Sequence, residues 1–289
     1  MGRKSTIRSA LPITYRSPGS TRDGPRDRWW LEDESLIPVV RDLVRIAATR
    51  PLSPDADVEV LKENDRKVVL RLVLSPQNGT GAGFIAKVHY LEALRRRMGY
   101  RRLCFDEAAA TITATGRGVP APRIAGCGLL ATPFGLVSAG MLLQEDLSGC
   151  TTVSDLIRSR GRDGKSCADL LERTTPLFIS LFEAGCNHID ANCDNILLAG
   201  GGGAAYLIDF QHAQFFDRPS AEVLMLEAGV FARSLTLRGL VSEDELRAWL
   251  DGLLVAAGVA GGDDKERLAR RFDHYRAVSL SRRVRRRVR

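Results

Sequence analysis

The segment HIDANCDNILL occupies residues 188–198, and the segment LIDF follows it at residues 207–210. The two segments hold Asp190, Asn195 and Asp209, and the last two of these each lie next to an apolar run. Because mostly glycine and alanine separate the segments, we predict a tight β-hairpin between them. Such a hairpin returns Asp209 to the side of Asn195, so the sequence predicts one site for all three side chains.

The residue types in this site suit the transfer of a phosphoryl group. A hydroxyl nucleophile needs a carboxylate that orients it or accepts its proton, which is the role expected of Asp190. A triphosphate carries charge that a metal ion neutralises, and Asn195 and Asp209 supply the oxygen ligands that Mg²⁺ prefers. The order H-x-D-x-x-x-x-N, hairpin, Asp-Phe is that of a kinase catalytic loop, in which His188 braces the loop. Any one of these residues alone also fits a turn or a cap, but the complete order is typical of a catalytic site.

Lys87 lies in the apolar segment FIAKV at residues 84–88. A lysine in a strand is often an edge residue that faces solvent. This one follows two other predicted strands, where a kinase places its phosphate-binding lysine. Such a lysine needs a carboxylate partner; we favour Glu107, near the start of a predicted helix, and Glu92 is the alternative.

Two further segments bear on nucleotide binding. Residues 141–147 form the predicted connection between a strand-rich and a helix-rich half, and we expect backbone groups near Glu145 and Leu147 to pair with adenine. The turn at residues 62–66 lies where a kinase has a glycine-rich loop, but it contains no glycine. In this respect the sequence departs from the protein-kinase pattern.

The order of elements predicts an α+β protein. Three β-rich runs, a helix near Glu107 and a strand at residues 141–143 precede a mainly helical half. We therefore predict a protein-kinase-like fold with two lobes, a small antiparallel β-sheet in the N-lobe and a mainly helical C-lobe. Residues 1–33 have few apolar positions, which predicts a loosely docked arm. The predicted parts are an N-terminal arm and helix at 1–54, the N-lobe at 55–144, the C-lobe at 145–278 and an arginine-rich tail at 279–289.

Local signals predict several helices. Apolar residues at helical spacing predict helices at residues 35–48 and across residues 170–182, where Pro176 is expected to start or kink the helix. Ser242 and Glu245 form a capping-box pattern ahead of a further helix.

The composition is that of an ordinary globular chain. The 289 residues are 44% hydrophobic and 27% charged, which suffices for one large domain or two lobes. The six cysteines form no CxxC pair, so we expect neither a zinc site nor a disulfide framework. No segment has the roughly 20 apolar residues of a spanning helix or the apolar core of a secretory signal, so we expect a cytoplasmic protein.

Positive charge is concentrated in two places. The net charge is +7, and six arginines lie within residues 281–289, so the rest of the chain is nearly neutral. A second arginine run spans residues 95–102. Each run is either a solvated surface or a site for an anion, which for the tail includes an anionic membrane. Because aromatic residues do not alternate with these arginines, we expect no nucleic-acid partner.

Two longer stretches resemble a known family. Residues 84–128 carry the strand lysine, an arginine-rich stretch, Glu107 and the segment GVPAP, and residues 185–214 carry GCNHID and IDFQHAQ. Both are similar to the lipopolysaccharide core kinases, the WaaP and Kdo-kinase group. The resemblance extends over about residues 55–260.

The resemblance implies ATP with Mg²⁺ and transfer to a sugar hydroxyl, of heptose or Kdo, in the inner core of lipopolysaccharide. It implies Asp190 as base, Asp209 as metal ligand, and Lys87 with Glu107 at the ATP phosphates. It also implies a glycolipid substrate and work at the cytoplasmic face of the inner membrane. Ile189 stands where many relatives have arginine, and Asn195 fits the general kinase pattern better than the WaaP branch.

Two alternatives remain open from the sequence. Phosphotransferases for other small molecules, such as aminoglycosides, share the H-x-D-x-x-x-x-N and Ile-Asp segments. A pseudokinase scaffold is the second alternative, favoured by the turn without glycine.

Overall fold

The computed structural model describes residues 3–16, 26–48, 58–72, 83–91, 104–131, 136–162, 167–259 and 262–288. The chain divides into two compact units. Unit 1 comprises residues 1–113 and 122–147, and unit 2 comprises residues 114–121 and 148–289.

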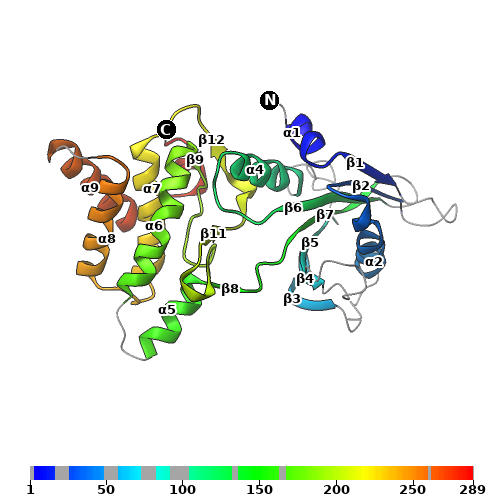
Figure 1. Ribbon diagram of the computed structural model, residues 1–289, viewed down its shortest axis with the longest axis horizontal. Coiled ribbons are helices and arrows are strands. Elements are labelled where there is room, and N and C mark those ends of the chain that lie inside the picture. Colours follow the sequence, from blue (N-terminus) through cyan, green and yellow to red (C-terminus); the bar gives the residue numbers. More distant parts are fainter. Residues whose placement is uncertain are drawn as a thin grey trace. The chain divides into compact units, whose positions relative to one another are not determined.

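Unit 1 is built on a seven-stranded sheet in the order β1-β2-β6-β7-β5-β4-β3 (Figure 1). Every neighbouring pair in this sheet is antiparallel. Its strands are β1 (Ile13–Arg16), β2 (Arg26–Leu31), β3 (Val58–Asn64), β4 (Lys67–Leu72), β5 (Phe84–Tyr90), β6 (Ile124–Ala131) and β7 (Val137–Glu145).

Helices cover both faces of this sheet. Alternate strand residues point to opposite faces, so Met141 and Leu142 belong to different cores. The helix α2 (Ile37–Ala48), which follows the short 3-10 helix η1 (Glu34–Leu36), packs in the core that contains Met141. The helices α1 (Arg3–Ala10) and α4 (Cys104–Gly116) contribute to the core that contains Leu142.

The N-terminal segment differs from the prediction of a loosely docked arm. Residues 13–16 and 26–31 are strands of the sheet, with β2 paired to β6 in the register Trp29↔Gly128. Trp29 and Leu31 are fully buried, and this burial outweighs the polar composition around them. Sparse apolar residues were therefore enough to fix two strands.

Unit 2 is mainly helical, with two small sheets (Figure 1). One sheet has the order β11-β10-β8 and the other pairs β12 with β9. The helices are α5 (Val153–Arg162), α6 (Ala168–Glu183), α7 (Ala221–Thr236), α8 (Glu243–Ala256), α9 (Gly262–Ala277) and α10 (Arg282–Arg285). The strands are β8 (Cys150–Thr152), β9 (Cys186–Asn187), β10 (Ile196–Ala199), β11 (Ala205–Leu207) and β12 (Gln214–Phe215), and the 3-10 helices are η4 (Gly200–Gly202) and η5 (Phe210–His212).

The helix α7 lies at the centre of unit 2 and is apolar on almost all sides, as expected of a buried helix. Gly229 lets α9 approach closely, because a Cβ at this position would lie 2.6 Å from the Cβ of Tyr275. Phe178, Trp249 and Phe231 form an aromatic cluster with centroid separations of 5.3 to 5.5 Å. This core gives the loops of unit 2 a rigid base.

The α+β fold class predicted from the sequence is confirmed, with an antiparallel sheet in one unit and helices dominating the other. The predicted hairpin is present as β10 paired with β11, Ile196 opposite Leu207. Ser242 and Glu245 form the predicted capping box at the start of α8. Pro176 lies inside α6 rather than at its start. Within the described residues, no helix combines the length and apolar character needed to cross a membrane.

Candidate active site

The segment from His188 to Asn195 leaves β9 and enters β10 within unit 2. The His188 side chain is fully buried, and its Nε2 donates to the carbonyl of Ile208 at 3.1 Å. Its ring meets Phe210 edge-on, with centroids 4.7 Å apart. Burial lowers the pKa of His188 to about 4, so the ring is neutral at physiological pH. His188 therefore ties the loop to the segment that carries Asp209.

Ile189 has a backbone conformation that β-branched residues rarely adopt. Its φ is 76°, in the left-handed region. The amide of Ile189 donates to Glu227 Oε1 at 2.7 Å, and its carbonyl accepts from Arg285. Polar side chains thus bind the backbone on both sides of this residue, which offsets a strain of roughly 1–3 kcal/mol.

Glu227 is a buried carboxylate on α7. Burial raises the pKa of Glu227 to about 7, and the hydrogen bond from Ile189 only partly opposes the shift. Oε2 of Glu227 has no hydrogen-bond partner in the described part of the chain, and a buried ionised oxygen without a donor is unfavourable. Glu227 is therefore a positioning group for the loop.

Asp190 follows directly and is 23% exposed at its side chain. Its Oδ2 accepts from Arg282 at 2.9 Å, and its Oδ1 accepts from Asn192 at 3.2 Å. Arg285 lies 3.6 Å from the same Oδ1. The carboxylate is accessible, and its orientation is set by three neighbours.

Asn195 and Asp209 lie on the two arms of the hairpin. The amide of Ile208 donates to the carbonyl of Asn195 at 3.0 Å. Asp209 directly follows Ile208, so this hydrogen bond holds the backbone of Asp209 near Asn195. The side-chain nitrogen of Asn195 donates to the carbonyl of Asp190 at 2.8 Å, which leaves its Oδ1 as the acceptor. Asp209 has φ 68°, a second left-handed residue in this region.

This donor set fits a magnesium ion. One carboxylate and one amide oxygen are hard oxygen donors, and Mg²⁺ is typically bound by one or two carboxylates with substrate phosphates completing the shell. Over the described residues no cluster of three or more His, Cys, Asp or Glu side chains is placed to hold a metal. An ion here would thus depend on the nucleotide for its remaining ligands.

Two neighbouring contacts anchor the far end of the loop. Asp194 pairs with Arg238 through both carboxylate oxygens, at 2.8 and 2.5 Å, and this lowers the pKa of Asp194. The amide of Cys193 donates to the hydroxyl of Ser234 at 3.0 Å. Asp194 is therefore a structural acid, although it stands beside the predicted site in sequence.

In unit 1, Lys87 of β5 contacts Glu107 of α4 at 2.5 Å, the partner that the sequence favoured. The two side chains are only 8% and 2% exposed. Oε2 of Glu107 has no hydrogen-bond partner among the residues described. Moving the lysine away would leave the buried charge of Glu107 unpaired, which is unfavourable. The pair therefore fixes the position of Lys87.

The connection at the end of β7 holds Glu145 and Leu147. The amide of Glu145 donates to the carbonyl of Arg123 at 2.9 Å, so this amide is already occupied. Leu147 is half-buried at the last position of unit 1. The pairing of backbone groups near Glu145 and Leu147 with adenine stays a prediction.

The turn between β3 and β4 is closed by Asn64, whose Oδ1 accepts from the amides of Arg66 and Lys67 at 3.0 and 2.9 Å. These amides are the ones that a phosphate-binding loop would offer. The turn therefore does not present free amides in the manner of a glycine-rich loop. Glu92 and the arginine run at 95–102 lie outside the described residues.

The sequence analysis did not identify Glu227, Arg282 or Arg285 as part of the site. A signal existed for Glu227, which is the one acid in the run LMLEAGVFA. No local pattern marks the partner of Arg282, because Asp190 lies far away in sequence.

Two features of the chain are typical of kinases. One is a buried strand lysine paired with a helix glutamate, and the other is a loop with the H-x-D-x-x-x-x-N order. The model of the lipopolysaccharide kinase (Kdo/WaaP) family matches residues 84–221 of the chain. The resemblance noted from the sequence is confirmed. The protein is accordingly an ATP-using phosphotransferase that acts on an alcohol group.

A search of the curated proteins finds no match to the sequence. One solved structure similar to the chain is described as WaaP in complex with acyl carrier protein. The two share 18% sequence identity with a TM-score of 0.49, and the match covers 76% of this chain and 87% of that chain.

The variant Lys87→Met tests the buried pair. It leaves Glu107 buried without its cation, so we expect the free energy of unfolding to fall by about 3–5 kcal/mol. The double variant Lys87→Met with Glu107→Leu removes both charges and should recover most of the loss. Urea denaturation measures both. Equal stability of wild type and the single variant would contradict the pairing.

The variant Glu227→Gln tests the buried carboxylate through pH. Native Glu227 keeps its proton up to about pH 7, whereas the unfolded chain releases it near 4.5. Its contribution to the free energy of unfolding therefore falls as pH rises through this window. Glu227→Gln lacks this loss, so its stability relative to wild type should rise by on the order of 3 kcal/mol from pH 4.5 to 7. Parallel stability curves from denaturant titrations would rule out the raised pKa.

Proposed function

We propose that the protein uses Mg²⁺ with ATP to phosphorylate a sugar hydroxyl of the lipopolysaccharide inner core, on heptose or Kdo. The observation that carries the proposal is the setting of Asp190. It is an accessible carboxylate that follows a residue held by Glu227 and Arg285, in a segment otherwise largely buried. A carboxylate held in this way is suited to orient a hydroxyl and accept its proton.

The other roles follow from the chemistry of each side chain. Asn195 and Asp209 would hold the magnesium ion, which when bound neutralises charge on the phosphate oxygens. Lys87, steadied by Glu107, would bind the ATP phosphates as a point charge. Backbone groups at Glu145 and Leu147 would pair with adenine.

We further propose that the protein works at the cytoplasmic face of the inner membrane, in peripheral contact with it. The support is the glycolipid acceptor that the family implies and the arginine-rich C-terminus, since an anionic leaflet attracts clustered arginines. An aminoglycoside or another small molecule is the competing acceptor. Offering core oligosaccharide and aminoglycoside side by side to the purified protein separates the two.

The variant Asp190→Ala tests the proposed base. We expect phosphate transfer from ATP to core oligosaccharide to fall by roughly 10²–10⁴-fold, because the hydroxyl loses its proton acceptor, while ATP binding survives. Asp209→Ala should instead lose the nucleotide binding that depends on Mg²⁺. Transfer is measured with radiolabelled ATP, and binding by calorimetry with and without the metal.

Asp194→Asn is the matched control, since Asp194 lies in the same loop but is bound to Arg238. It should retain the turnover of folded wild type. Unchanged turnover in Asp190→Ala would contradict the role of Asp190 as the base. Unchanged metal-dependent nucleotide binding in Asp209→Ala would contradict the role of Asp209 as a metal ligand.

A further inference from the structure

The first part of the arginine-rich C-terminus, which includes Arg282 and Arg285, contacts the candidate site. The side-chain nitrogen of Asn187, in β9, donates to the carbonyl of Arg285 at 3.1 Å. Ser281 caps α10, with its hydroxyl accepting from the amide of Val284. These contacts seat α10 against the start of the catalytic loop, within unit 2.

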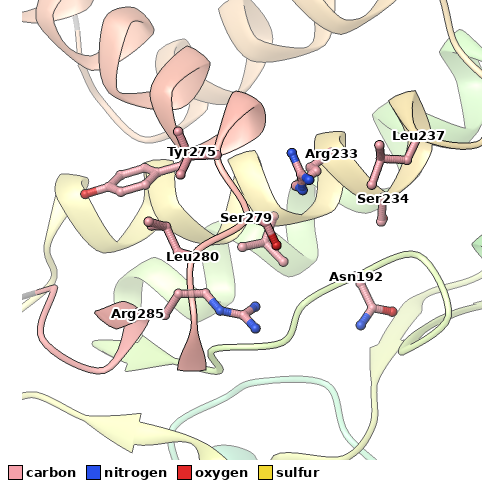
Figure 2. Close-up of a pocket in the computed structure, with 10 residues that line it drawn as sticks. Asn192, Arg233, Ser234, Leu237, Tyr275, Ser279, Leu280 and Arg285 are labelled. Atoms are coloured by element: carbon pink, nitrogen blue, oxygen red, sulfur yellow. The ribbon is translucent and has the colours of Figure 1, made fainter. Parts of the chain in front are cut away.

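Two arginines of α10, Arg282 and Arg285, differ in burial. Arg285 is 13% exposed at its side chain, binds the carbonyl of Ile189, and lines a cavity of about 190 Å³ together with Asn192. Figure 2 shows its guanidinium directed from the C-terminal segment toward Asn192. Arg282 is 54% exposed, and within the described chain Asp190 is its one charged partner. Arg285 is thus fixed, whereas Arg282 is held by a single exposed ion pair.

Arg282 donates to Oδ2 of Asp190, an oxygen that could otherwise accept the proton of an incoming hydroxyl. Oδ1 of Asp190 already accepts from Asn192 and lies near Arg285, and Oδ2 accepts from Arg282. An acceptor hydroxyl must therefore share or replace one of these donors. Arg282 is the easiest to replace, because an exposed ion pair contributes little to stability.

The surroundings of Arg282 favour an anion in place of Asp190. Arg286 lies beside it and contacts Nδ1 of His212 at 2.9 Å. Burial and the charges of Arg282 and Arg286 lower the pKa of His212, so its ring adds no competing charge at neutral pH. A guanidinium binds a carboxylate or a phosphate through two parallel hydrogen bonds, which a neutral hydroxyl cannot offer.

We propose that Arg282 recognises an anionic group of the acceptor, a carboxylate or a phosphate close to the hydroxyl that is phosphorylated. In the free enzyme Arg282 pairs with Asp190, and on binding it moves to the anionic group and frees Oδ2 for the hydroxyl. This rests on the proposed function and adds that the acceptor is charged next to its reactive hydroxyl.

Steady-state kinetics on the full-length protein test the proposal. The acceptors are intact core oligosaccharide, the same material with its carboxyl groups reduced, and the same material dephosphorylated with hydrofluoric acid.

For wild type, one of the two treatments should raise the KM for the acceptor tenfold or more. If carboxyl reduction has this effect, the anionic group is a carboxylate; if dephosphorylation has it, the group is a phosphate. Arg282→Ala should raise the KM for the intact acceptor tenfold or more. In this variant the KM for the intact acceptor should equal the KM for the treated acceptor that wild type binds poorly. Arg282→Lys should be intermediate, and Arg287→Ala, an exposed neighbour on the same segment, should match wild type.

The proposal is overturned if neither treatment changes the KM of wild type, or if Arg282→Ala still distinguishes the acceptors. Amide hydrogen exchange of residues 281–288 gives a readout without turnover. It should become faster in Asp190→Asn and on adding intact oligosaccharide to wild type. Slow exchange in both cases would refute the ion pair exchange, whereas faster exchange with no phosphate transfer would refute the kinase function alone.

Discussion

The backbone of Ile189 is the constraint on which the candidate site depends. A β-branched residue at φ 76° is unfavourable by itself, yet a buried carboxylate binds its amide and a guanidinium binds its carbonyl. Those two contacts turn the chain so that Ile189 is buried and Asp190 reaches the surface. The helix α7, which carries Glu227, is itself fixed by the aromatic core and by the close approach of α9 at Gly229.

Burial separates the groups that hold the site from the groups proposed to act. His188 and Glu227 are fully buried, with pKa values shifted in opposite directions to about 4 and about 7. Desolvation favours the neutral form of each, in contrast to the charged Arg285 that binds the carbonyl of Ile189. Asp190 and Arg282, the groups proposed to act, lie where solvent reaches. In unit 1 the pair of Lys87 and Glu107 is the exception, because both charges are buried together.

The sequence predicted the fold class, the hairpin from β10 to β11 and the helix cap at Ser242, since each depends on neighbours in sequence. It could not predict strands β1 and β2, where a few buried side chains such as Trp29 outweigh a polar composition. It also could not predict the contact of Arg282 with Asp190. That contact depends on the path of the chain after α9, which sequence patterns do not reveal. A run of arginines is also what a solvated tail would contain. Glu227 was visible as one acid in an apolar run, but its partner was not.

The proposed roles of these residues all depend on the transfer of phosphate by this loop to a core sugar. The most direct test is mass analysis of core oligosaccharide from a strain lacking the gene, complemented with wild type or with Asp190→Ala. We expect that the deletion removes one phosphate from heptose or Kdo, that wild type restores it and that Asp190→Ala does not. An unaltered core mass in the deletion strain, or restoration by Asp190→Ala, would contradict it.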